Sequence, residues 1–176
     1  MNAVIINEDT KQHVILTGGS GTGKSGYAKS LILENIRNKK INLVVDTDNE
    51  YGPLTYEQYG TNIYHTELFE HKFTKPLTRV SLLEFHKLEN NSIEEIERQE
   101  QILNDNLLHV VKFSNIDYLF IDEGQYLLHQ YPIFFTELIK QATRRKIVIV
   151  LITYDFKRIE NNLKSVISDC SRVIQF

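Results

Sequence analysis

The residues best suited to chemistry are eight consecutive residues near the start of the chain, which fit the phosphate-binding pattern G-x-x-x-x-G-K-[ST] at every fixed position. Glycines are needed there because backbone N–H groups must turn inward around phosphate oxygens, and Gly18, Gly21 and Gly23 supply that freedom. Lys24 would reach the β- and γ-phosphates, and the Ser25 hydroxyl would ligate Mg²⁺. We therefore predict a nucleoside triphosphate site formed by the whole octet: Gly18, Gly19, Ser20, Gly21, Thr22, Gly23, Lys24 and Ser25.

A second set of candidate residues, Asp122 and Glu123, directly follows the apolar run 118–121. A carboxylate at the end of a buried strand can hold the water shell of Mg²⁺, while its neighbour orients or deprotonates an attacking water. We assign Asp122 to the metal and Glu123 to the water. An acidic pair alone is a weak signal, but together with the phosphate loop it predicts hydrolysis of the bound nucleotide.

Four further residues have both a functional and a purely structural explanation. Thr153 ends an apolar run and could sense the γ-phosphate, or its hydroxyl could bond to nearby backbone. Arg144 and Arg145 could contact the γ-phosphate of a neighbouring subunit, or they could only complement the C-terminal dipole of a helix. Asp46 could lie near the bound nucleotide, or it could belong to a solvated acidic turn. The residues alone leave these alternatives open.

The elements that must position these residues alternate between strand and helix. Apolar runs predict strands at 13–17, 41–45, near 79–83, 118–121, 147–152 and 173–176. Helical spacing predicts helices at 25–39, at 93–112 and after Pro132. Residues 4–6 could pair with 13–17 as a hairpin, and 52–79 are expected to form loops and short elements. This order predicts an α/β fold of the P-loop NTPase type, with a mostly parallel, doubly wound sheet, helices on both faces and the ligand at the carboxyl ends of the strands.

Composition limits the classes of protein that fit this pattern. The 176 residues suit a single P-loop ATPase domain, 1–176, with a hydrophobic content of 41% that is ordinary for α/β proteins. A lone cysteine, Cys170, excludes a disulfide framework within one chain and suits a cytoplasmic location. No stretch is long and apolar enough to predict a transmembrane segment. The net charge of −3 means that any contact with DNA must come from local basic patches.

The chain resembles the HerA/FtsK superfamily of ring-forming, DNA-translocating ATPases, and especially the genome-packaging ATPases of membrane-containing viruses. The resemblance runs almost from end to end and lies in four segments: 13–18 leading into the loop, 44–51, 120–125, and the arginine pair before the strand that ends at Thr153. It implies ATP and Mg²⁺ as cofactors and double-stranded DNA as a partner. It also implies a hexameric ring in which an arginine, Arg144 or Arg145, acts on a neighbour's nucleotide, and a capsid or membrane protein at a portal vertex as a further partner.

Two departures from the family pattern bear on these expectations. The family has glutamine after the sensor threonine, whereas this chain has Tyr154, which places γ-phosphate sensing in question. We also expect no added DNA-guiding domain, in which case DNA would have to be held by loops of the core. The segment His71–Lys75 combines cations with an aromatic residue and is a candidate for that contact, although the residues alone favour a solvated basic loop.

Other P-loop proteins share part of the pattern. The Zot-type assembly ATPases of filamentous phages resemble the C-terminal half about equally well and would place the same ATPase in virion extrusion. Thymidine kinases of the zinc-bearing type resemble residues 121–126 and 147–156, with Glu123 as the base for the nucleoside hydroxyl. Those kinases carry paired cysteines for zinc, however, and this chain has only Cys170.

Overall fold

The strands form one seven-stranded sheet in which every pairing is parallel, in the order β3-β4-β2-β5-β6-β1-β7. The computed structural model describes residues 13–56, 59–82, 93–124, 131–156 and 172–176. The strands are β1 (Val14–Thr17), β2 (Asn42–Asp46), β3 (Gly60–Tyr64), β4 (Leu77–Ser81), β5 (Tyr118–Ile121), β6 (Val148–Thr153) and β7 (Arg172–Gln175). The predicted α/β class with a doubly wound parallel sheet is confirmed.

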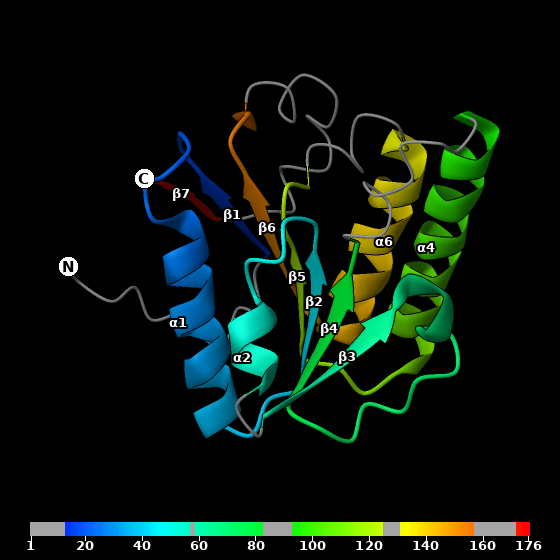
Figure 1. Cartoon of the computed structure of the whole chain (residues 1–176), viewed down its shortest axis with the longest axis horizontal. Helices are drawn as coiled ribbons and strands as arrows, with labels where there is room; N and C mark the ends of the chain where they lie inside the picture. The colour runs from blue at the N-terminus through cyan, green and yellow to red at the C-terminus, as the bar shows by residue number, and fades with distance from the viewer. Residues whose placement is uncertain (1–12, 57–58, 83–92, 125–130, 157–171) are drawn as a thin grey trace.

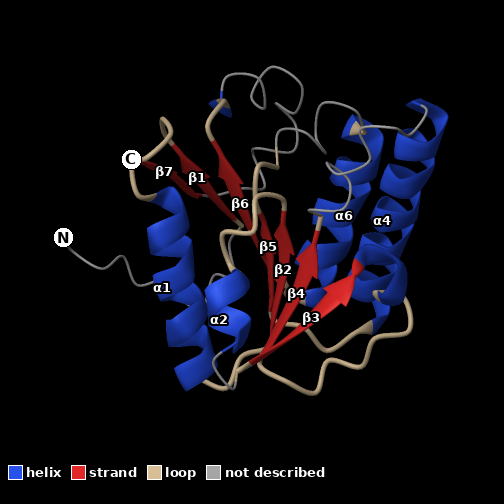
Figure 2. Ribbon diagram, viewed as in Figure 1, coloured by secondary structure: helices blue, strands red, loops and turns tan. Residues whose placement is uncertain are grey.

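Helices cover both faces of this sheet, as Figures 1 and 2 show. Helices α1 (Lys24–Arg37) and α2 (Gly52–Tyr56) lie on one face, and α4 (Ile93–Phe113) and α6 (Pro132–Arg145) lie on the other. A short 3-10 helix, η2 (His65–Glu67), follows β3. None of the helices in the described part of the chain is both long and apolar enough to cross a membrane.

Each central strand contributes side chains to two separate hydrophobic clusters. In β2, Leu43 and Val45 pack with α4 and α6, whereas Val44 packs with α1. In β1, Ile15 joins the first cluster, and Val14 and Leu16 join the second. Because both faces are covered, these strands read as continuous apolar runs without alternation.

The weakly patterned segment 52–79 contains a strand that the sequence did not single out. Strand β3 lies at the edge of the sheet, and Ile63 is its only buried residue. An edge strand with one buried side chain carries too little apolar pattern to be recognised. The neighbouring strand β4 begins two residues earlier than the strand expected near Arg79, and the hairpin expected from residues 4–6 lies outside the described residues.

The strand order brings the candidate chemical groups to one edge. Strand β6 lies between β1, which leads into the phosphate loop, and β5, which leads to Asp122. Strand β2 pairs with the other side of β5 and leads into the acidic turn that begins at Asp46. All four strands are parallel, so their carboxyl ends lie together at the same end of the sheet.

Candidate nucleotide-binding site

The phosphate loop joins β1 to α1 and has the backbone that the motif requires. Gly18, Gly21 and Gly23 have φ angles of 149°, 74° and 104°, which side chains with a Cβ rarely adopt. At Gly18 there is also no room, because a Cβ would approach the carbonyl oxygen of Phe176 to 2.7 Å. Thr22 closes the turn by donating its hydroxyl to the Gly19 carbonyl at 2.9 Å.

The ammonium group of Lys24 is folded onto this loop. It donates to the carbonyl oxygens of Gly18 and Gly19, each at 2.8 Å, and the residue is buried. Both contacts are made to neutral carbonyls, which are weaker partners than the oxygens of a phosphate. The side chain therefore lies where a phosphate held by the loop would attract it.

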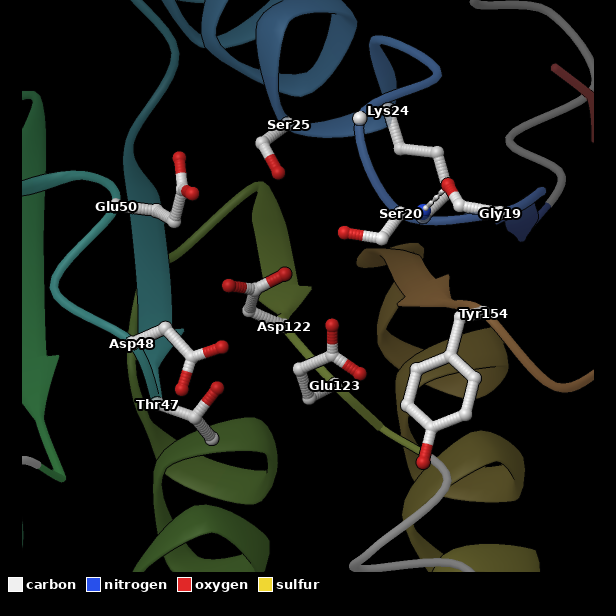
Figure 3. Close-up of a pocket in the computed structure, with 11 residues that line it drawn as sticks. Gly19, Ser20, Lys24, Ser25, Thr47, Asp48, Glu50, Asp122, Glu123 and Tyr154 are labelled. Atoms are coloured by element: carbon white, nitrogen blue, oxygen red, sulfur yellow. Dashed lines mark hydrogen bonds between the residues drawn. The ribbon is translucent and has the colours of Figure 1, made fainter.

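A cavity of about 570 Å³ opens beside the loop, a volume suited to a nucleotide. Figure 3 shows Ser25, Asp122 and Glu123 directed toward the same space, with Tyr154 on its far side. The lining comprises Gly19, Ser20, Gly21, Lys24, Ser25, Thr47, Asp48, Glu50, Asp122, Glu123 and Tyr154. The structure thus brings the two predicted halves of the site, the phosphate loop and the acidic pair, into one pocket.

Asp122 and Glu123 occupy different environments within this pocket. Asp122 is buried, and its burial, followed by the charges of Glu123 and of the acidic turn, raises its pKa to about 7. Glu123 is half-buried and has a φ of 48°, in the left-handed region that non-glycine residues rarely occupy. This conformation turns the chain sharply after β5, and Figure 3 shows both carboxylates directed toward the pocket.

The next residue, Gly124, fixes that turn against the sheet. Its N–H donates to the carbonyl of Ile152 in β6 at 3.0 Å. A Cβ at this position would lie 2.0 Å from the Leu151 side chain, so only glycine allows such a close approach. The pairing of a strained Glu123 with a confined Gly124 indicates that the position of the Glu123 carboxylate is tightly specified.

The acidic turn after β2 lines the pocket through residues that the sequence had not selected. Thr47, Asp48 and Glu50 line it, whereas Asp46, the expected nucleotide contact, does not. The Asp46 side chain is fully buried and accepts hydrogen bonds from Arg79 Nε at 2.5 Å and from the N–H groups of Glu50 and Tyr51 at 3.0 Å. Asp46 is therefore neither part of a solvated turn nor a lining residue, and it holds the turn in shape from behind.

Tyr51 closes the back of this turn. Its ring is fully buried, and its hydroxyl, which has no hydrogen-bond partner of good geometry among the described residues, lies near Ser25. Burial, together with the nearby charges of Asp122, Asp46 and Glu50, raises the pKa of Tyr51 above its usual value. The phenol is therefore neutral and keeps its O–H as a donor, although Tyr51 is not among the residues that line the pocket.

The structure separates the expected sensor from the pocket. Thr153 is fully buried, and its hydroxyl accepts a hydrogen bond from the N–H of Asp155 at 3.1 Å. Tyr154, which replaces the family's glutamine, lines the pocket instead and is 48% exposed. The structural explanation of Thr153 thus agrees with its geometry, and the side chain that reaches the pocket from this end of β6 is the phenol of Tyr154.

The arginine pair lies at the opposite end of the sheet. Helix α6 ends at Arg145 and strand β6 begins at Val148, so both arginines are near the amino ends of the strands. Both are exposed, and Arg145 donates to the Ser114 carbonyl at 2.8 Å. Because the pocket is at the carboxyl ends, neither arginine can reach the nucleotide of its own subunit.

Charge in the pocket indicates what must accompany a triphosphate. Among the described residues, four carboxylates line it, from Asp48, Glu50, Asp122 and Glu123, against one cation, that of Lys24. An anionic ligand would therefore enter together with a cation. The described residues contain no group of three or more His, Cys, Asp or Glu side chains able to hold a metal by themselves. Mg²⁺ fits this arrangement, because it is commonly bound through one or two protein ligands together with phosphate oxygens and water.

Comparison with solved structures supports the fold. The genome packaging NTPase B204 from Sulfolobus turreted icosahedral virus 2, solved with ATP-gammaS, matches with a TM-score of 0.62 at 19% identity, over 95% of this chain and 75% of that chain. VirB4 of Thermoanaerobacter pseudethanolicus matches with a TM-score of 0.68 at 9% identity, over 93% and 76% of the two chains. At such identities these likenesses establish the P-loop NTPase fold.

Comparison of the sequence with protein families gives a more specific result. A search of curated proteins finds no match. The family model described as "Helicase HerA, central domain" matches residues 3–169, which is nearly the whole chain. That match includes the phosphate loop, the acidic turn, Asp122, Glu123 and both arginines. The protein is an ATPase that belongs to the family of the HerA helicase central domain.

Proposed function

We propose that this protein is an ATP-driven translocase of double-stranded DNA that packages a viral genome. The observation that carries the proposal is the single pocket in which Lys24, Ser25, Asp122 and Glu123 converge, in a chain of the HerA family. The packaging role is supported by the likeness to B204, which is named as a genome packaging NTPase. A Zot-type role in phage assembly would use the same pocket.

In this proposal each side chain has a distinct task in hydrolysis. Lys24 moves from the carbonyls of Gly18 and Gly19 to the phosphates, and Ser25 and Asp122 provide the protein ligands for Mg²⁺. When bound, Mg²⁺ neutralises charge on the phosphates. Glu123 orients the attacking water and accepts its proton, because its carboxylate is partly exposed at the mouth of the pocket. Tyr154 takes the place of the sensing side chain on the far side.

The proposal includes a ring of subunits, because no arginine lines the described part of the pocket. An arginine supplied by a neighbour stabilises charge that develops only in the transition state and is worth roughly 10³ to 10⁵ in turnover. We assign this role to Arg144, because the guanidinium of Arg145 is already held by the Ser114 carbonyl. The family likeness suggests a hexamer.

Mixing of subunits tests the ring. Arg144→Ala should leave ATP affinity near normal and nearly abolish hydrolysis, and Lys24→Ala should lose nucleotide binding. Mixed together, the two variants should recover part of the activity, because some interfaces join an intact phosphate loop to an intact arginine. A monomeric protein whose specific rate of hydrolysis is independent of concentration would exclude the ring.

A phosphate-release assay with and without double-stranded DNA tests the function itself. We expect hydrolysis of ATP that increases when DNA is added, and no phosphorylation of thymidine in a parallel reaction. Transfer of phosphate to thymidine would identify a nucleoside kinase instead. Hydrolysis that is indifferent to every DNA tested would leave an ATPase but exclude a DNA translocase.

A further inference from the structure

A second cleft, of about 460 Å³, lies at the end of the sheet opposite the nucleotide pocket. It is formed where the segment before β4, the residues after α4 and the end of α6 meet, and Figure 1 shows these three segments near the amino ends of the strands. The side chains that matter for its chemistry are Lys72, Thr74, Phe113, Asn115 and Arg145. This amino-end cleft unites two sets of residues that the sequence left separate, the basic segment 71–75 and the arginine pair.

Among the described residues, the lining of the amino-end cleft is cationic and contains no carboxylate. One guanidinium N–H of Arg145 donates to the Ser114 carbonyl, which fixes the group in place and leaves the other donors without a partner among the described residues. The ammonium group of Lys72 likewise has no hydrogen bond or ion pair within the described part of the chain. His71 contributes no charge at neutral pH, because burial lowers its pKa. Two cations thus belong to a cleft whose described lining includes no carboxylate.

Exposed aromatic rings continue from one wall of this cleft. Phe113 contacts His109 at 4.9 Å between ring centroids, and His109 contacts Phe69 at 4.1 Å. Phe113 is 72% exposed and Phe69 is 54% exposed. We call these three residues the aromatic ladder. The two exposed phenylalanines, each in contact with His109, offer aromatic faces on which another planar ring can stack.

We infer that the amino-end cleft and the aromatic ladder bind a single-stranded segment of nucleic acid. Arg145 and Lys72 would hold successive phosphates, and Phe113 and Phe69 would stack on the bases. A free anion would leave the ladder uncovered, and a purely apolar protein partner would bury two unpaired cations at a cost. A nucleic-acid strand whose bases are unpaired satisfies both halves of the surface at once.

This inference goes beyond the proposed function, because it places an open strand in the cleft, whereas the proposed motor moves a duplex. It also changes the role of Arg145, which becomes a contact for the nucleic-acid backbone, while Arg144 remains the candidate for the neighbouring nucleotide. A closed duplex shows its phosphates but hides its base faces. The ladder therefore discriminates between an open strand and a duplex, and the cations do not.

Binding of a labelled oligothymidylate, measured by fluorescence anisotropy without nucleotide, tests the inference. Arg145→Ala, Lys72→Ala and Phe113→Ala should each weaken binding, with a loss of about five- to hundredfold for the stacking residue. Arg145→Lys should recover part of the affinity, and Phe113→Trp should keep it. Lys140→Ala is the matched control, because Lys140 is an exposed cation of the same helix that lies outside the cleft.

The ligands in the assay separate the two halves of the surface. A strand with the same phosphates but no bases should bind more weakly than oligothymidylate, and Phe113→Ala should not change its affinity. A covalently closed hairpin duplex should behave in the same way. Both Phe69 and Phe113 are exposed, so their truncation should leave the thermal unfolding midpoint unchanged. If the three alanine variants bind oligothymidylate as well as Lys140→Ala does, or if the closed duplex depends on Phe113 equally, the inference is wrong.

The experiment also separates failure of this inference from failure of the proposed function. Stimulation of phosphate release by a closed duplex reports on the translocase, and oligothymidylate binding without nucleotide reports on the cleft. If the alanine variants weaken oligothymidylate binding but a duplex does not stimulate phosphate release, the cleft is supported and the translocase is excluded. If a duplex stimulates phosphate release but the alanine variants bind oligothymidylate normally, the translocase is supported and the cleft is excluded.

Discussion

The two ends of the sheet carry opposite chemistry. In the part of the chain that the structure describes, the pocket at the carboxyl ends is lined by four carboxylates and one lysine, and the amino-end cleft is lined by Lys72 and Arg145 without a carboxylate. Helix dipoles explain part of this contrast, because helices in such a fold begin at one end of the sheet and finish at the other. They do not explain the exposed ring of Phe113. Charge at a helix end is therefore weak evidence of function, and charge combined with exposed aromatic rings is stronger.

The largest effect is expected where the pocket performs chemistry. Glu123→Gln removes the base but leaves the phosphate loop intact, so ATP should stay bound while turnover falls by about 10² to 10⁴. Lys24→Ala should instead weaken binding itself. Filter binding of ATP and phosphate release, measured on both variants, distinguish the two effects. Normal turnover by Glu123→Gln would show that the carboxylates at this end are structural.

The next effect concerns the carboxylate that the structure assigns to stability. Arg79→Met leaves the buried carboxylate of Asp46 without its ion-pair partner, which should cost about 3–5 kcal/mol of unfolding free energy. The matched control is Lys29→Met, which breaks the exposed pair with Glu50 and should cost less than about 1 kcal/mol. Urea denaturation measures both. Equal losses for the two variants would contradict the distinction between a buried support and an exposed pair.

Protonation of Asp122 should make the stability of the metal-free protein depend on pH. Its pKa is raised from 3.8 to about 7 in the folded state, so the folded protein binds this proton more tightly than the unfolded chain does. Stability from this group is therefore present at low pH and is lost as pH rises from about 4 to 7, by about 4 kcal/mol at most. Mg²⁺ should restore stability above pH 7 and have little effect at pH 5. Thermal unfolding at a series of pH values, with EDTA or with Mg²⁺, measures this dependence of stability on pH. Asp122→Asn should flatten the pH profile of stability. A profile that Asp122→Asn leaves unchanged would show that another group titrates.

The smallest effect distinguishes the two lysines of the basic segment. Lys72 lines the amino-end cleft, whereas Lys75 donates to the Gly60 carbonyl at 3.2 Å and lies outside it. Lys72→Ala should reduce the slope of log affinity for single strands against log salt by about 0.7, the value for one phosphate contact. Lys75→Ala should leave the slope unchanged. Equal slopes for the two variants would show that the segment is a solvated basic loop.

The sequence predicted the parts of the site that are encoded by neighbouring residues. The phosphate loop and the Asp122–Glu123 pair could be located because each is short and directly follows an apolar strand. The role of Asp46 could not, because its side chain is directed by Arg79, a partner 33 residues away. The same contact between Asp46 and Arg79 holds the turn in the shape that makes lining residues of Thr47, Asp48 and Glu50.

The amino-end cleft could not be predicted from the sequence either, because it also depends on residues that are far apart in the chain. Lys72 and Arg145 are far apart in the chain, and the fold brings both into the lining of one cleft, where the segment before β4 lies near the end of α6. Strand β3 was missed because an edge strand with a single buried residue, Ile63, has no repeating apolar pattern. Local motifs could thus be predicted, whereas contacts between distant segments required the structure.

Simultaneous binding of ATP-gammaS and oligothymidylate tests the two-ended account most directly. If the pocket and the amino-end cleft are separate sites, one ATP-gammaS should bind per chain at saturation, with or without a saturating concentration of the oligonucleotide. Equilibrium dialysis with labelled nucleotide measures that stoichiometry. The account predicts an unchanged value of about one per chain. Displacement of ATP-gammaS by the oligonucleotide would contradict it, because both ligands would then occupy the acidic pocket at the carboxyl ends.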